Sequence, residues 1–401
     1  MIKEKLKEFL LIILFCVIKI IIFLIDIIYN ITQIFRKRKN HKICMLSRQS
    51  NDITLNFSLL KEEIEKQDKE AEIYISCMRF KFSFKYIINI IKDLWNLSNS
   101  KIAIIDGYSI PICNFTNKKL KVFQIWHSFG SMKSFGKNTV GKKNGRSLFV
   151  EKVFNMHKNY DYIFASSKAY SKNLVSGFGY GEENCIICPL PVVDVLNRKK
   201  KLYNYIIKNE EFEKINKKLD KKKKTILYAP TTRNDFETLE SAIFDILDII
   251  DFKKYNFVLK MHKNENINFS QKDIDKYLKN KYNNLNGINA YIDNNSLTLE
   301  YILISEILIS DYSCVIYEAM EADTNVFLYI PDYNEYIKNT GLEVDLKKEF
   351  KDLYAEDKKT LKNILEKKYP KEKMEKIKNK YVTKNENSTE TMVKIILEKG
   401  R

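Results

Sequence analysis

Short β-rich runs alternate with helix-like segments along the chain after residue 40, and this alternation restricts the fold more than any other feature. The β-rich runs are Ile43–Ser47, Glu72–Cys77, Ile102–Asp106, Val122–Trp126, Tyr162–Ala165, Cys185–Cys188, Thr225–Ala229, Asn256–Met261, Ile307–Ser310 and Val326–Ile330. Helix-like stretches such as Phe57–Gln67 and Phe84–Leu97 lie between them. Strands that alternate with helices predict an α/β fold with parallel, doubly wound sheets.

A Lys-rich block over residues 198–224 interrupts this pattern and reads as a solvated helical connection. We therefore expect two Rossmann-like α/β domains, 41–195 and 196–401, behind an N-terminal segment, 1–40. Ligands of such folds bind beyond the carboxyl ends of the strands. Two facing domains would place the functional site in the cleft between them.

The N-terminal segment is predicted to attach the chain to a membrane. Residues 9–35 are almost entirely apolar, and their length suits a bilayer span. Lys19 and Asp26 lie about 20° apart around a helix, so a narrow polar stripe fits a helix lying flat equally well. The cluster Arg36–Lys39 follows at once, which favours a cytoplasmic location for the rest of the chain.

The charge of the chain indicates an anionic partner. Its 401 residues include 69 Lys and Arg against 51 Asp and Glu, a formal net charge of +18. A membrane surface, a nucleic acid or a phosphorylated substrate would fit, although the Lys excess also suits the base composition of an Ile-, Asn- and Lys-rich gene. The seven cysteines are scattered, which indicates a reducing compartment and excludes a disulfide scaffold.

Four polar runs follow predicted strands directly, where a doubly wound fold exposes side chains to ligand. They are Gln124–Gly136, Tyr228–Arg233, Leu259–His262 and Ser310–Cys314. The last run precedes a predicted helix over Val315–Glu321, whose N-terminus would favour an anion. Two of the four histidines in the chain, His127 and His262, fall in these runs. This set of groups suits the transfer of a phosphorylated or nucleotide-bearing group.

The order of the four runs resembles the CDP-glycerol glycerophosphotransferases of teichoic acid and capsule polymer synthesis. The shared features are a Gln-x-Trp-His segment, then Tyr-Ala-Pro-Thr-x-Arg, then a basic residue two positions before a His, then Ser-Asp-Tyr-Ser. The resemblance covers about residues 41–345. It implies a glycosyltransferase-B-like architecture, with an N-terminal acceptor domain and a C-terminal donor domain, at the cytoplasmic face of the cell membrane.

The resemblance also implies roles for particular residues. His127 and His262 match catalytic positions, with His127 as the proposed base. The positions implied to bind substrate are Ser128, Thr231, Arg233, Lys260, Asp311, Ser313, Cys314 and Glu318. No metal ligands and no certain cofactor are implied, and stimulation by a divalent cation is left open.

The expected activity is therefore transfer of a polyol phosphate, with glycerol phosphate first, from a CDP-alcohol to a lipid-linked acceptor, with release of CMP. The anionic membrane surface is the second expected partner. Two alternatives are a sugar-nucleotide-dependent glycosyltransferase of the same fold and a CDP-ribitol-dependent enzyme. No aromatic-basic motif of the usual modules is present, so we do not expect a nucleic-acid partner.

Overall fold

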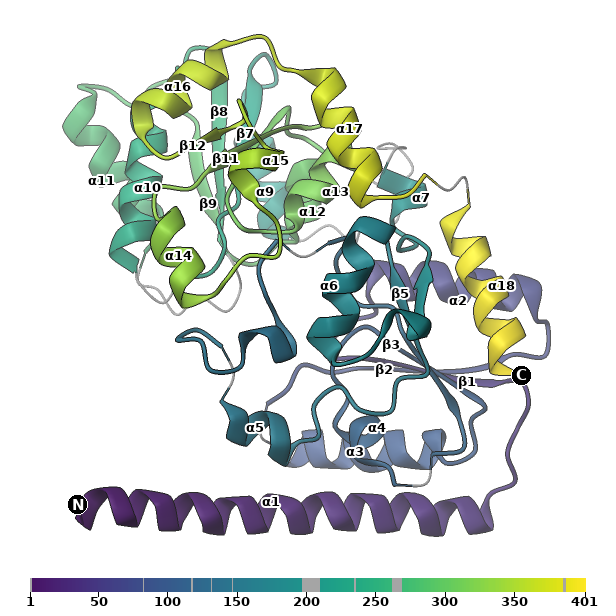
Figure 1. Cartoon of the computed structure of the whole chain (residues 1–401). Coiled ribbons are helices and arrows are strands. Elements are labelled where there is room, and N and C mark those ends of the chain that lie inside the picture. The colour runs from purple at the N-terminus through teal and green to yellow at the C-terminus, as the bar shows by residue number, and fades with distance from the viewer. Residues whose placement is uncertain are drawn as a thin grey trace. The chain divides into compact units, whose positions relative to one another are not determined.

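The computed structural model contains two six-stranded sheets in which every strand pair is parallel (Figure 1). It describes the chain except residues 1, 82, 117, 131, 146, 197–209, 234–235, 262–268 and 385–386, and it describes side chains from residue 12 onward. The chain forms two compact units: unit 1 comprises residues 1–127, 135–192 and 385–401, and unit 2 comprises 128–134 and 193–384.

The sheet of unit 1 has the strand order β2-β1-β3-β4-β5-β6. Its strands are β1 (Lys42–Ser47), β2 (Glu72–Cys77), β3 (Ile102–Ile105), β4 (Lys121–Gln124), β5 (Tyr162–Ala165) and β6 (Cys185–Ile187). Its helices are α1 (Ile2–Phe35), α2 (Leu55–Gln67), α3 (Phe84–Leu97), α4 (Ile110–Asn114), α5 (Leu148–Val153), α6 (Lys168–Phe178) and α18 (Ser388–Gly400), with 3-10 turns at Gly136–Thr139 and Glu182–Asn184.

The sheet of unit 2 has the strand order β12-β11-β10-β7-β8-β9. Its strands are β7 (Lys224–Tyr228), β8 (Tyr255–Lys260), β9 (Ala290–Asp293), β10 (Ile307–Ser310), β11 (Asn325–Tyr329) and β12 (Tyr354–Ala355). Its helices are α7 (Val193–Leu196), α9 (Glu210–Lys218), α10 (Phe236–Ile249), α11 (Gln271–Lys281), α12 (Thr298–Ile302), α13 (Val315–Glu321), α14 (Tyr333–Asn339), α15 (Leu346–Glu349), α16 (Lys358–Glu366) and α17 (Lys371–Tyr381).

The predicted α/β fold with parallel, doubly wound sheets is thereby confirmed. The central strands are continuous apolar runs because both faces of a parallel sheet are covered by helices. All four residues of β3 and of β10, for example, are buried. The sequence missed β9 and β12, which are the two edge strands of unit 2 and carry four and two residues.

The last helix of the chain packs on the first unit. The sequence analysis assigned residues 196–401 to one domain, but α18 contacts α2 and β4 of unit 1. Its apolar face is fully buried, since Met392, Val393 and Ile396 are 0% exposed. The apolar side chains of this helix need a surface to pack on. Only the tertiary structure shows that unit 1 provides that surface.

The N-terminal helix also belongs to unit 1, where it contacts α3, α4 and α5. Its segment Ile12–Phe35 is long and apolar enough to cross a membrane by length and composition, with a mean hydropathy of 2.9. Only 17% of the most apolar window of this segment is buried within the protein.

Candidate active site

Three neighbouring strands of unit 1 bring Ser47, Asp106 and His127 to one edge of the sheet. Ser47 ends β1, Asp106 follows β3, and His127 lies three residues after β4. The strand order β1-β3-β4 makes these strand ends adjacent, and the side chains there face the ligand side of a parallel sheet.

A backbone hydrogen bond fixes the orientation of the His127 ring. Nδ1 lies 2.9 Å from the carbonyl oxygen of Asp106. Because a carbonyl oxygen only accepts, Nδ1 carries the proton of the neutral ring and Nε2 is its basic nitrogen. The side chain is exposed. This arrangement suits a general base that acts through Nε2.

Gln124 shapes the turn that carries His127. The side chain is fully buried; its Oε1 accepts from the Trp126 amide at 2.9 Å, and its Nε2 donates to the Gly107 carbonyl at 3.0 Å. Trp126 has a φ of 61°, a conformation that is uncommon for a bulky residue. The Gln124 hydrogen bonds and the stacking of Trp126 on Phe135 at 5.2 Å hold this turn in place.

The Asp106 carboxyl is buried within unit 1. It is 3% exposed, and its Oδ2 accepts from the Ser47 hydroxyl at 2.7 Å. Burial disfavours the charged form and raises the pKa of Asp106 to about 7. Asp106 therefore supports His127 through its carbonyl while its own carboxyl is held inside the protein.

The residues that directly follow His127 belong to unit 2. Met132 accepts from the Glu343 amide at 2.8 Å, the Ser134 amide donates to Gly341 at 3.1 Å, and Lys133 forms a β-bridge with Leu342. The polar run Gln124–Gly136 is thus divided: its QxWH motif, Gln124–His127, lies in unit 1 and Ser128–Ser134 lies in unit 2.

Within unit 2 this segment packs on the turn that begins α13. The Cys314 thiol and the Ser128 hydroxyl both donate to the Gly130 carbonyl, at 2.7 and 2.8 Å. A Cβ atom on Gly130 would lie 2.6 Å from the Tyr317 ring, so only glycine fits there. Glu318 lies one helical turn after Cys314, and burial raises its pKa to about 7. The structure therefore brings together Ser128 and Cys314, two of the residues predicted to bind substrate.

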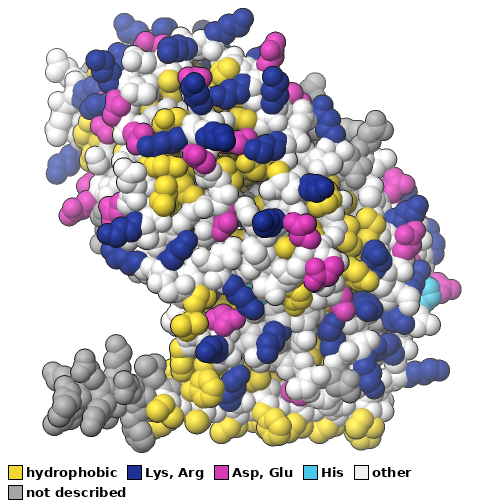
Figure 2. All heavy atoms as spheres, in the orientation of Figure 1, with side chains coloured by type: hydrophobic (Ala, Val, Ile, Leu, Met, Phe, Trp, Pro, Cys, Tyr) yellow, Lys and Arg dark blue, Asp and Glu magenta, His cyan; other side chains and the backbone are white. Residues whose placement is uncertain are grey.

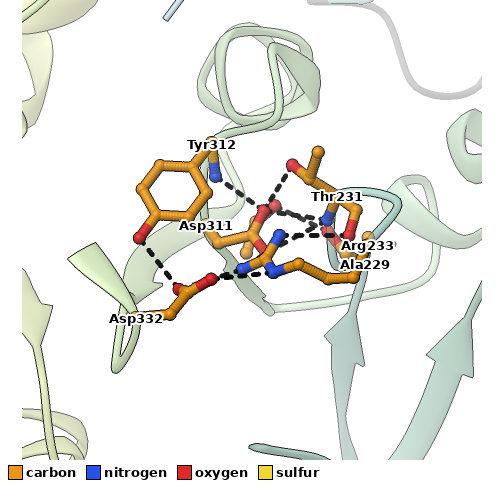
Figure 3. Close-up of polar contacts among 7 residues, drawn as sticks. Ala229, Thr231, Arg233, Asp311, Tyr312 and Asp332 are labelled. Atoms are coloured by element: carbon orange, nitrogen blue, oxygen red, sulfur yellow. Dashed lines mark hydrogen bonds and ion pairs between the residues drawn. The ribbon is translucent and has the colours of Figure 1, made fainter. Parts of the chain in front are cut away.

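A buried ion-pair network joins the loops after β7, β10 and β11 (Figure 3). Asp311 is 0% exposed and accepts from the Thr231 amide at 2.8 Å and the Thr231 hydroxyl at 2.6 Å. The Arg233 guanidinium lies 2.9 Å from Asp311 and 3.0 Å from Asp332. Both carboxylates raise the pKa of Arg233 against the opposing effect of its burial.

Two tyrosines complete this network. The Tyr312 hydroxyl donates to Asp332 at 3.0 Å, and its ring stacks on Tyr336 with 3.7 Å between centroids. The Arg233 guanidinium carbon lies 5.1 and 5.2 Å from the two ring centroids. Thr231, Arg233 and Asp311, each expected to bind substrate, thus lie together and contact one another. Their arrangement positions the loops at this edge of the sheet.

Lys260 ends the third strand at this edge. Lys260 is the last residue of β8, is 4% exposed, and donates to the Met261 carbonyl at 2.6 Å. Strand β8 neighbours β7, which neighbours β10, so Lys260 and Ser313 lie at the same edge of the sheet. His262 lies outside the described residues.

The sequence analysis included Gln124 in a motif but assigned no role to Ser47, Asp106 or Asp332, which hold the loops at the two sheet edges. A usable signal was present for all three, since Ser47 and Asp106 end predicted strands and Asp332 follows the predicted strand Val326–Ile330. The pairing of Asp332 with Arg233 had no such signal, because it joins positions 99 residues apart. Among the described residues, no group of three or more His, Cys, Asp or Glu could hold a metal ion.

Comparison with known proteins decides the family. A family model described as CDP-Glycerol:Poly(glycerophosphate) glycerophosphotransferase matches residues 28–398. The chain belongs to this family. It is therefore a member of a transferase family, as the four ordered motifs predicted.

The relatives of this glycerophosphotransferase family member act in teichoic acid synthesis. It is 26% identical to a teichoic acid ribitol-phosphate primase of Bacillus spizizenii over 75% of both chains. It is 25% identical to a teichoic acid glycerol-phosphate primase of Bacillus subtilis over 68% of this chain and 66% of the relative. A poly(ribitol-phosphate) polymerase of Bacillus spizizenii is 27% identical, and the match spans about half, 48%, of that longer chain.

Solved structures show the same fold. The wall teichoic acid polymerase TagF, soaked with CDPG, superposes with a TM-score of 0.67 over 99% of this chain and 98% of that chain, at 18% identity. The UDP-GlcNAc 2-epimerase of Methanocaldococcus jannaschii superposes with a TM-score of 0.58 over 89% of this chain and 99% of that chain, at 14% identity. These likenesses establish the glycosyltransferase-B-like fold for this member of the family.

Replacement of Asp106 by Asn is expected to change how stability depends on pH. The folded pKa of Asp106 is about 7 and the ordinary value is 3.8, so between these values the folded state holds more protons. The stability that the protonated Asp106 carboxyl contributes to the folded state is fully present below pH 3.8. It is lost as pH rises through about 7, by at most about 1.4 kcal/mol per pH unit. Asp106→Asn should therefore lose less stability than the wild type between pH 5 and pH 8.

Urea unfolding followed by tryptophan fluorescence measures this effect, because Trp95 and Trp126 are the two tryptophans of the chain and both lie in unit 1. The control is Asp52→Asn, an exposed carboxyl of the same unit. Equal pH dependence in Asp106→Asn and the wild type would contradict the assignment.

Replacement of Arg233 by Met is expected to destabilise unit 2. The variant leaves two largely buried carboxylates without their cation, and breaking a buried pair in this way costs about 3–5 kcal/mol. Calorimetric melting should show the loss, with Arg233→Lys intermediate and the exposed Lys254→Met unchanged. A melting temperature unaltered in Arg233→Lys together with a raised KM for the nucleotide donor would instead show that Arg233 contacts substrate.

Proposed function

We propose that this protein transfers a polyol phosphate, glycerol phosphate first, from a CDP-alcohol to an acceptor hydroxyl and releases CMP. The observation that carries the proposal is the His127 geometry: Nδ1 donates to the Asp106 carbonyl, which makes Nε2 the basic nitrogen of an exposed ring. The family to which the chain belongs, described by its CDP-glycerol chemistry, supports the reaction class.

The proposed chemistry is a displacement at the β-phosphorus. The acceptor oxygen forms a bond to this phosphorus while Nε2 of His127 takes the hydroxyl proton. The bond between the β-phosphorus and the bridging oxygen breaks, and its electron pair leaves with CMP. The imidazolium that forms is stabilised by the Asp106 carbonyl at Nδ1. General-base assistance of this kind contributes roughly 10²–10⁴-fold to the rate.

The donor is proposed to bind at the carboxyl edge of the unit 2 sheet. Lys260 and His262 would neutralise the pyrophosphate, while Ser313, Cys314 and Glu318 would contact the phosphate or the polyol. The packing of Ser128–Ser134 on α13 supports this arrangement, because the peptide that follows His127 contacts the turn at Cys314 through the Gly130 carbonyl. The buried network of Thr231, Arg233 and Asp311 would hold the loops of the donor site in place.

Ribitol is the second candidate for the transferred polyol. The specific observation in its favour is that two relatives matched over 75% and 77% of this chain are named for ribitol phosphate. The acceptor is proposed to be lipid-linked and reached from the cytoplasmic face of the membrane, which fits the apolar α1 and the Arg36–Lys39 cluster. Release of CMP from CDP-glycerol or from CDP-ribitol distinguishes the two polyols.

A donor screen tests the proposed reaction. The full chain is incubated with membranes and CDP-glycerol, CDP-ribitol or UDP-GlcNAc, and release of CMP or UDP is measured. We expect acceptor-dependent CMP release from CDP-glycerol, or from CDP-ribitol if ribitol is the native polyol. Release of UDP with no CMP from either CDP-alcohol would favour a sugar-nucleotide transferase and overturn the proposal.

Replacement of His127 by Ala tests the general base. Transfer should fall by about 10²–10⁴-fold because the base is absent. CDP-glycerol affinity, measured by calorimetry, should be retained because the donor is proposed to bind unit 2. The control is His41→Ala, a histidine of unit 1 whose Nδ1 lies 3.0 Å from the Asp68 carboxylate. Unchanged turnover in His127→Ala would eliminate it as the base.

A further inference from the structure

Arg48 is a half-buried cation at the carboxyl edge of the unit 1 sheet. It directly follows β1, and its Nε is buried without a hydrogen-bond partner. Lys and Arg side chains are scattered over the visible surface of the molecule (Figure 2), so an exposed cation alone indicates no site. Burial makes Arg48 different, because a guanidinium removed from water needs ion pairs or hydrogen bonds to offset its lost hydration.

Two other guanidinium groups of the chain, those of Arg233 and Arg401, meet this need by contacting carboxylates. Among the described residues, no carboxylate lies within ion-pair distance of Arg48. The buried carboxyl at the same edge, that of Asp106, accepts from the Ser47 hydroxyl instead. Arg48 therefore keeps a positive charge and N–H donors at the ligand edge of unit 1.

Two aromatic rings hold the Arg48 guanidinium. Its central carbon lies 5.1 Å from the ring centroid of Phe80 and 5.4 Å from that of Tyr108. Phe80 follows β2 and Tyr108 follows β3, so the loops after three neighbouring strands build this position. Contacts with rings use the flat faces of a guanidinium, whereas its N–H groups point outward in its plane. The rings therefore fix the side chain without using its hydrogen-bond donors.

Hydrogen bonds between these loops hold them together. The Gln49 amide donates to the Ser47 hydroxyl at 3.1 Å, and the exposed Arg79 donates through Nε to the Gln49 carbonyl at 2.9 Å. A Cβ atom on Gly107 would lie 3.0 Å from Nε2 of Gln49, so the loops after β1 and β3 are in close contact. Arg79 also adds a second positive charge to this edge. Arg48 is thus carried by loops that pack on one another, which suits a preformed binding position.

The same loops lead to His127. Ser47, the residue before Arg48, donates to the Asp106 carboxyl at 2.7 Å, and the Asp106 carbonyl accepts from Nδ1 of His127 at 2.9 Å. Tyr108, which contacts the guanidinium, follows Asp106 by two residues. An anion bound by Arg48 would therefore lie at the edge of unit 1 where the acceptor hydroxyl is proposed to react.

We propose that Arg48 binds a phosphate group of the acceptor and so positions the neighbouring hydroxyl for His127. The proposal rests on the proposed function and adds a group in unit 1 that recognises the acceptor. A guanidinium fork matches two oxygens of one phosphate. The proposed reaction joins a polyol to the acceptor through a phosphodiester, so its product carries such a phosphate beside free hydroxyls. Arg48 thus favours an acceptor that already ends in a polyol phosphate.

Acceptor kinetics of Arg48→Gln test this role. Two lipid-linked acceptors are compared: one ends in glycerol phosphate, and the other ends in a neutral sugar with its only phosphate next to the lipid. For the first, KM should rise about 10- to 100-fold because charged hydrogen bonds are lost, while kcat and the KM for CDP-glycerol change little. An equal rise for both acceptors would place the bound phosphate next to the lipid and overturn the positioning of the hydroxyl. An unchanged KM for both would overturn the proposal.

Two further variants separate binding from folding. Arg48→Lys keeps the charge but loses the fork, so its acceptor KM should lie between those of the wild type and Arg48→Gln. Arg401→Gln is the matched control, because it removes a guanidinium of the same unit that contacts Asp68 near His41, ahead of β1. Its acceptor KM should equal that of the wild type. A KM for CDP-glycerol that rises with the acceptor KM in Arg48→Gln would indicate general damage and overturn the assignment.

Binding measured without turnover keeps this test independent of the proposed function. Phosphorus NMR line broadening of glycerophosphoglycerol is recorded on the full chain, with CDP present to fill the proposed donor edge of unit 2. The Kd should be about tenfold or more higher for Arg48→Gln than for Arg401→Gln. Equal broadening by the two variants would overturn phosphate binding at Arg48. Weaker binding in Arg48→Gln, together with no CMP release by the wild type from either CDP-alcohol, would support the anion site and reject the proposed function.

Discussion

The parallel direction of every strand pair is the constraint on which the rest of this structure depends. It places the carboxyl ends of all strands of a sheet at one edge. Helices cover both faces of the sheet, so polar side chains lie in the loops at that edge. In unit 1 this edge holds Ser47, Asp106 and His127. In unit 2 it holds the loops of Thr231, Asp311 and Lys260. Within each unit, strand direction therefore brings the candidate site residues to one edge, although they lie far apart in the sequence.

Buried polar groups at the two sheet edges are stabilised in different ways. In unit 2 two carboxylates, Asp311 and Asp332, share the Arg233 guanidinium, so charge is matched by charge. In unit 1 Asp106 has a hydroxyl partner, and burial raises its pKa to about 7. The first arrangement holds together three loops of unit 2. The second leaves a carboxyl with a pKa of about 7 on the same residue whose carbonyl orients the His127 ring.

Much of the fold was readable from the sequence, and so was the place of several candidate site residues at strand ends, because these signals are local. Buried parallel strands are short apolar runs, and their polar C-terminal neighbours gave His127, Lys260 and the Ser313–Cys314 turn. The edge strands β9 and β12 were missed because their few residues carry no apolar run. The pairing of Arg233 with Asp311 and Asp332 was missed, and so was the hydrogen bond between Asp106 and His127. A contact between distant loops leaves no periodic pattern in the sequence of either loop.

The N-terminal region shows most clearly what the sequence determined alone and what tertiary structure decided. The apolar run and the cluster Arg36–Lys39 were enough to predict a membrane partner, because hydropathy and charge are sums over local residues. Where α1 docks on unit 1 depends on the hydrogen bonds of Asp26, whose partner Thr116 lies 90 residues away. Which side of α3 packs on the sheet is likewise set by distant partners, because Asn89 and Asp93 form hydrogen bonds with Ser76 and Tyr74 of β2.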